Sequence, residues 1–105
     1  MRAPSQLRLT CTIAKEIINR RALDTAQVVL TFHAQERMEE RGIVSDEVYR
    51  ILRSGAVFEL PIRNEQGDWQ VEIEKRMPGG RDVAVVTVVP QDDGLIVRTV
   101  MWRDL

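Results

Sequence analysis

The chain has little of several residue types, and each shortage excludes a class of protein. Cys11 is the only cysteine among 105 residues, which excludes an internal disulfide framework and a zinc site built from several thiolates. We therefore interpret Cys11 as a small buried apolar residue. Charged and polar residues interrupt every apolar stretch of the first twenty positions, so neither a signal peptide nor a membrane span is predicted there. A cytoplasmic protein with no membrane partner is expected.

A large excess of one charge is missing as well. The formal net charge is −1, with nine Arg or Lys against seven acids in residues 1–55 and six against nine in residues 56–105. Such a balance does not indicate a strongly basic nucleic-acid-binding domain. All the cations except Lys15 and Lys75 are arginine, the side chain that grips phosphates and carboxylates with two N–H groups. Codon bias explains that preference more simply.

The remaining composition is that of an ordinary folded domain. Hydrophobic residues make up 44% of the chain and charged residues 30%, which is the balance of a soluble globular protein. Because single domains usually contain about 100 to 200 residues, we interpret residues 1–105 as one domain.

Two to three helices are predicted in the first half. Thr31 can cap the start of a helix over Phe32–Arg41, and Gly42 can end it in the left-handed conformation. Ser45, followed by two acids, predicts the start of another helix that ends near residues 54–55. A first helix is predicted over about residues 5–22, where apolar residues recur at steps of three and four: Leu7, Cys11, Ala14, Ile18 and Ala22. Residues 24–30 connect it to the next helix, and Val28–Leu30 fits a connector or a short strand equally well.

The second half alternates with a period of two. Apolar residues at 69, 71 and 73 alternate with polar ones, which predicts a strand with one buried face. Strands are also predicted over residues 56–62, 83–89 and 95–102, with turns at 64–67, 78–80 and 92–94. Residues 83–89 are apolar on both faces, so this strand is placed centrally. The predicted fold class is α+β, with the helices packed on one side of an antiparallel meander of about four strands.

One predicted helix carries the only histidine in a row with two arginines. His33, Arg37 and Arg41 are four residues apart, so their side chains follow one slanting line along the helix. Two arginines at this spacing repel each other unless an anion lies between them, and an imidazole titrates near physiological pH. This combination favours a phosphate ligand.

The row has the residue types that metal-free RNA cleavage requires. One group removes the 2′-hydroxyl proton, another protonates the leaving oxygen, and cations stabilise the phosphorane. His33 cannot fill both proton-transfer roles at once, so Tyr49 or a carboxylate such as Glu40 is needed as a second group. The structural alternative is that Arg37 pairs with Glu40 and that Arg41 interacts with the helix dipole alone.

Part of the sequence resembles a known family. The stretch FHAQERMEERGIVSDEVYRIL resembles the signature of a family of uncharacterised small bacterial domains, and VRTVMW resembles its closing strand. The resemblance covers about residues 29–103 and leaves residues 1–28 as an additional helix and connector. The family is grouped with RelE-like and BrnT-like ribonuclease toxins.

This grouping implies a fold, a site and partners. It implies helices that precede a curved antiparallel sheet, and it implies RNA or an antitoxin-like protein as partner. It carries over His33, Arg37 and Arg41 as the site, with Thr99 and Trp102 as secondary RNA-binding candidates. No cofactor and no metal is implied. The near-neutral charge departs from the basic toxins, which weakens the ribonuclease interpretation because phosphate neutralisation supplies most non-specific affinity for nucleic acids.

Other interpretations stay open. A non-catalytic module could bind a protein through the same surface. A helix-turn-helix unit over residues 32–54 would place the acidic start of its second helix in the DNA groove, which is unfavourable. The aspartates at 92 and 93 fit a hairpin turn better than a cation site. Trp69 and Trp102 fit the core better than base stacking.

Overall fold

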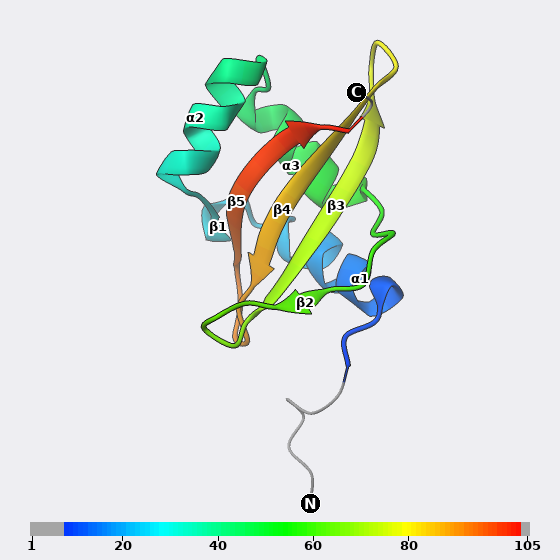
Figure 1. Cartoon of the computed structure of the whole chain (residues 1–105), viewed down its shortest axis with the longest axis vertical. Helices are drawn as coiled ribbons and strands as arrows, with labels where there is room; N and C mark the ends of the chain where they lie inside the picture. Colours follow the sequence, from blue (N-terminus) through cyan, green and yellow to red (C-terminus); the bar gives the residue numbers. More distant parts are fainter. Residues whose placement is uncertain (1–7, 104–105) are drawn as a thin grey trace, which may run out of the picture.

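The computed structural model describes residues 8–103. Three helices are followed by most of a five-stranded sheet (Figure 1). The elements are α1 (Cys11–Arg21), a 3-10 turn η2 (Thr25–Gln27), β1 (Val28–Leu30), α2 (Phe32–Arg41), α3 (Ser45–Ser54), β2 (Ile62–Arg63), β3 (Trp69–Met77), β4 (Arg81–Val89) and β5 (Leu95–Trp102). The predicted α+β class is confirmed.

The sheet is mixed and has one strand more than predicted. Its order is β1-β5-β4-β3-β2, so β4 is central, as its two apolar faces predicted. The strands β2 to β5 are antiparallel, but β1 pairs in parallel with β5 through Val28 and Leu95. The prediction of a purely antiparallel meander was wrong here, because β1 is three residues long and finds its partner some 65 residues later. A local pattern of alternation cannot indicate such a pairing.

The helices cover one face of the sheet and enclose the core. In Figure 1, α1 and α3 lie behind the strands, and α2 lies beside the C-terminal end of β5. The largest fully buried side chains come from α1, α3 and the inner face of the sheet: Ile18, Ile51, Leu52, Ile73 and Leu95. No described helix lies over the opposite face, which we call the outer face.

The local signals that start and end α2 act as predicted. The Thr31 hydroxyl accepts a hydrogen bond from the Ala34 amide at 3.1 Å, and Gly42 ends the helix with φ 68°. For α3 the predicted cap was wrong by one residue. Val44 occupies the cap position, where its amide donates to the Glu47 carboxylate at 2.9 Å, and Ser45 is already helical. The reciprocal Glu47 contact thus replaces a hydroxyl cap.

The start of α1 is also later than predicted. Residues 8–10 are not helical, and the Thr10 hydroxyl accepts from the Ile13 amide at 3.1 Å, which fixes the start at Cys11. Ala14, Ile18 and Ala22 are fully buried, as their spacing indicated. The expected start near residue 5, and Leu7, lie outside the described residues.

The predicted strand over residues 56–62 is mostly absent. Only its ends pair with β3: Ala56 forms a single bridge with Glu74, and Ile62 opposite Gln70 belongs to β2. Pro61 has no amide hydrogen to give to a ladder. At Gly55 the chain passes so close to α3 that an added Cβ would lie 2.5 Å from the Ile51 carbonyl oxygen. The segment therefore leaves α3 in a fixed direction but does not continue as a strand.

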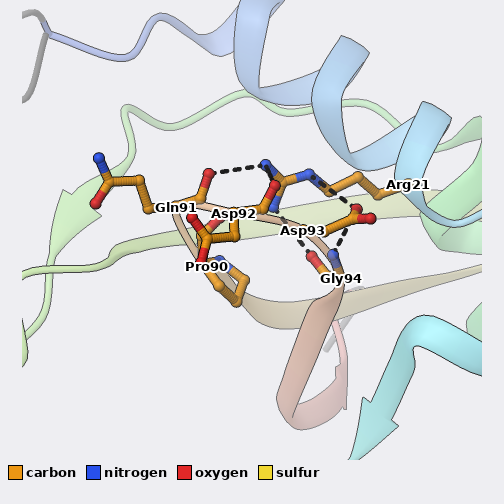
Figure 2. A network of polar contacts seen from close by, with 6 residues as sticks. All are labelled: Arg21, Pro90, Gln91, Asp92, Asp93 and Gly94. Atoms are coloured by element: carbon orange, nitrogen blue, oxygen red, sulfur yellow. Dashed lines mark hydrogen bonds and ion pairs between the residues drawn. The ribbon is translucent and has the colours of Figure 1, made fainter.

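The turn between β4 and β5 is a hairpin, as predicted, and one arginine from α1 holds it. Nη1 of Arg21 donates to the carbonyls of Pro90 at 2.6 Å and of Gly94 at 3.2 Å (Figure 2). Nη2 reaches the carbonyls of Gln91 and Asp92, each at 3.4 Å, and Nε lies 3.8 Å from Asp93. The guanidinium group of Arg21 therefore links the turn to α1.

Candidate functional site

His33 lies where α2 begins, close to the outer face of the sheet. Its side chain is exposed, and the residue two positions earlier anchors the helix to the sheet. The Thr31 hydroxyl donates to the Val97 carbonyl at 2.8 Å, and the Thr31 amide donates to the same carbonyl at 3.2 Å. The position of His33 relative to β5 is thus fixed by hydrogen bonds to the strand.

A surface hollow of about 410 Å³ opens beside His33. It spans three strands, because Gln70 belongs to β3, Val86 to β4 and Thr99 to β5. Its described lining consists of Thr31, His33, Gln70, Val86, Arg98 and Thr99. Val86 lies directly opposite Thr99 in the register of β4 and β5. The histidine of the first half of the chain and Thr99 of the closing strand therefore border the same hollow.

Arg98 contributes the cation of this hollow, and it was not among the site residues predicted from the sequence. The register between β4 and β5 shifts here: Thr87 faces Val97, whereas Val86 faces Thr99, so Arg98 is the extra residue of a β-bulge. A bulge bends its strand and re-aims a side chain. The available signal was the interval of three between the buried residues Val97 and Val100, which breaks the alternation of a regular strand.

Arg37 is not directed to the hollow. Its Nη1 forms an ion pair with the Glu40 carboxylate at 2.9 Å, and the side chain is 29% exposed. Its Nε is buried and has no hydrogen-bond partner within the described residues. The pairing of Arg37 with Glu40 is the structural alternative that the spacing allowed.

Arg41 has a structural contact of its own. Its Nη1 donates to the Val100 carbonyl of β5 at 3.1 Å, and it lies in the last turn of α2, where a cation favours the helix dipole. Neither Arg37 nor Arg41 is among the described residues that line the hollow. The helical row exists, but of its three members only His33 reaches the hollow.

Tyr49 and Trp102 belong to the core side of the molecule. Both are partly buried and pack against the hydrophobic core. The guanidinium of Arg81 also stacks over the Trp102 ring, 4.1 Å from the ring centroid. Of the predicted site residues, the hollow therefore brings together His33 and Thr99, and it leaves Tyr49 and Trp102 on the helix-covered side.

Next to the hollow the outer face is acidic. Glu59, Glu72 and Glu74 surround Arg103, with carboxylate oxygens 3.5, 3.0 and 3.7 Å from its guanidinium nitrogens. Burial raises the pKa of Glu72, and the opposing effect of Arg103 does not cancel it. The close Glu72 oxygen is buried and lacks the alignment of a hydrogen bond. Among residues 8–103, no group of three or more His, Cys, Asp or Glu side chains is arranged to hold a metal ion.

Comparison with known proteins identifies the family. Residues 30–102 match the family described as a domain of unknown function, DUF4258, and the chain belongs to this family. This agrees with the predicted membership in a family of uncharacterised small domains. No curated protein and no solved structure matches the chain. None of the helices within residues 8–103 is long and apolar enough to cross a membrane.

Proposed function

We propose that this DUF4258 domain is a metal-independent ribonuclease of the RelE-like group that binds an RNA phosphate in the hollow beside His33. The observation that carries the proposal is the convergence of one imidazole, one guanidinium and two hydroxyls on a single open hollow. His33 and Thr99 are 66 positions apart in the sequence, so their meeting is a product of the fold.

The lining residues supply the groups that cleavage needs. The His33 imidazole takes the 2′-hydroxyl proton, the 2′-oxygen attacks phosphorus, and the bond from phosphorus to the 5′-oxygen breaks. The leaving 5′-oxygen takes a proton from a water molecule, and the imidazolium returns its proton to the resulting hydroxide, so the products are a 2′,3′-cyclic phosphate and a 5′-hydroxyl. Arg98 faces the charge of the phosphorane, and the Thr99 hydroxyl and Gln70 amide donate to its oxygens. Arg98 thereby replaces Arg37 and Arg41 as the phosphate ligand, because their guanidinium groups already contact Glu40 and the Val100 carbonyl.

A protein partner is the second candidate for the same surface. The net charge of −1 and the acidic group next to the hollow favour it, because RNA is repelled by carboxylates. In that case the hollow binds one carboxylate of an antitoxin-like chain, from an acidic side chain or the C-terminus, and no RNA is cleaved. A single carboxylate is repelled less strongly than the many phosphates of RNA. His33 would then contribute to affinity alone.

The two candidates separate in one experiment. Purified protein is incubated with total RNA in excess EDTA, and 5′-hydroxyl ends are counted. We expect cleavage that falls about 100-fold or more in His33→Ala and Arg98→Ala, the usual size of a general-base or charge-stabilising effect. Arg50→Ala, which removes an exposed guanidinium from α3, is the matched control and should cleave normally. Absence of cleavage by the wild-type protein, or equal activity of all variants, contradicts the ribonuclease proposal.

A further inference from the structure

A second surface lies at the sheet edge beyond β3, on the other side of the acidic group from the His33 hollow. Three large apolar side chains project into solvent at alternate positions of the segment that joins α3 to β2. We call them the edge strip: Phe58, Leu60 and Ile62, which are 71%, 62% and 59% exposed. Val57, which precedes Phe58, and Pro61 are buried, whereas Glu59, between Phe58 and Leu60, is exposed. Exposed apolar side chains grouped in this way mark interaction surfaces more often than scattered ones do.

The backbone beside the edge strip is unpaired. Between the Ala56–Glu74 bridge and β2, residues 57–61 form no backbone hydrogen bond with the rest of residues 8–103. In Figure 1 this segment runs outside β3, along the open edge of the sheet. Soluble proteins usually protect such an edge with charges or a covering element, because its free N–H and C=O groups accept another extended chain.

The negative charge around the edge strip favours a basic binding partner. Glu59 lies within the strip and is 67% exposed, and it shares the guanidinium of Arg103 with Glu72 and Glu74. Three carboxylates thus face one cation. A second copy of this chain would bring the same carboxylates against them in a symmetric pair, which is unfavourable. A basic partner is favoured instead.

Room for a side chain exists at one end of the edge strip. A hollow of about 320 Å³ is bordered by Phe58 together with Ala56 and Glu74. Lys75 and Arg76 also line it, and Arg76 is bound to the Asp82 carboxylate at 2.9 Å. An apolar or long basic side chain entering this hollow therefore contacts a phenyl ring and a carboxylate together.

We infer that the edge strip binds an extended segment of a partner protein, one face of which carries apolar side chains on either side of a lysine or arginine. The apolar side chains cover Phe58, Leu60 and Ile62, and the cation lies against Glu59. The partner's main chain supplies hydrogen bonds to residues 57–61. Phe58, Leu60 and Ile62 do not line the His33 hollow, and RNA plays no part in this contact.

The inference is tested with a defined peptide and the full chain. The heptapeptide Thr-Val-Thr-Lys-Thr-Val-Thr places valine, lysine and valine on one face when extended. Added to isotope-labelled protein, it should shift the backbone amide NMR signals of residues 57–60, of Ile62 and of Glu72. A matched peptide with glutamate in place of lysine should bind about tenfold more weakly, because an attractive contact becomes a repulsive one.

Two variants locate the contact on the protein. Leu60→Ser should weaken binding of the lysine peptide about tenfold, the scale of losing one buried apolar contact. Leu23→Ser removes a side chain that is 71% exposed after α1, and it should leave binding unchanged. Equal binding of both peptides, shifts confined to other residues, normal binding by Leu60→Ser, or no shifts at millimolar peptide each overturn the inference.

Discussion

The helix-covered face and the outer face are built by the same three strands, β3 to β5, but they obey different requirements. On the covered face Val71, Ile73, Val85 and Val97 are at most 1% exposed, so any polar group there must find a partner inside the protein. On the outer face Gln70, Glu72 and Thr99 remain half-buried and polar. Even there Ala84 is fully buried beneath its longer neighbours on β3 and β5.

The difference shows where function can reside. The covered face determines the fold through apolar volume, and its residues are interchangeable only with residues of similar size. The outer face is less constrained by apolar volume, so it carries polar side chains such as Gln70, Glu72, Glu74 and Thr99, with Arg98 at the bulge of β5. The hollow and the acidic group both lie there.

The largest expected effect comes from deleting the same side chain on each face. Ile73→Ala on the covered face should lower the free energy of unfolding by about 2–5 kcal/mol, because Ile73 is fully buried. Ile96→Ala on the outer face should lower it by about 1 kcal/mol, since Ile96 is only partly buried. Urea unfolding of both variants measures this. An equal loss of unfolding free energy in the two variants would show that Ile96 is as buried as Ile73, which contradicts an open outer face.

A smaller effect distinguishes the two faces by function. Thr87 is fully buried, and its hydroxyl donates to the Ile96 carbonyl at 3.1 Å. Thr87→Val should lower the free energy of unfolding by about 1 kcal/mol and leave RNA cleavage unchanged. Thr99→Val should change stability by less than about 0.5 kcal/mol and reduce cleavage about tenfold through one lost hydrogen bond. If both variants act alike in the two assays, the division of roles between the faces is wrong.

The smallest expected effect is on pH dependence. Because burial raises the pKa of Glu72 in the folded state, the folded protein holds its proton at pH values where the unfolded chain has released it. The corresponding stability is fully present below the ordinary glutamate range and is lost as pH rises through the raised value. Glu72→Gln should therefore flatten the fall of unfolding free energy as pH rises above the ordinary glutamate pKa of about 4.3. A steeper fall in the variant would mean that the ion pair with Arg103 outweighs burial.

The elements that were predicted correctly depend on neighbours in the sequence. The hydroxyl of Thr31 and the left-handed Gly42 act within one helical turn of α2, and the alternation in β3 is a property of nine consecutive residues. The parallel pairing of β1 with β5 and the loss of the strand over residues 57–61 depend on distant parts of the chain. Alternation alone gives no information on either.

The candidate site divides in the same way. The four-residue spacing that aligns His33 with Arg41 is a helical property and is present. Which of these side chains borders the hollow depends on how α2 packs against β5. In that packing Arg41 donates a hydrogen bond to the Val100 carbonyl of β5. Arg98 enters the hollow only through a shift in register. A regular strand would have been expected to place Arg98 and Thr99 on opposite faces.

The contact between Arg21 and the β4–β5 turn has a consequence for the boundaries of the domain. The family match begins at residue 30, yet α1 lies before it and contributes Ala14 and Ile18 to the core. A chain shortened to residues 30–102 would leave the hairpin carbonyls of Pro90 and Gly94 without their donor and would open Leu52 and its neighbours to water. Helix α1 is therefore a structural component of this domain, although the family match does not include it.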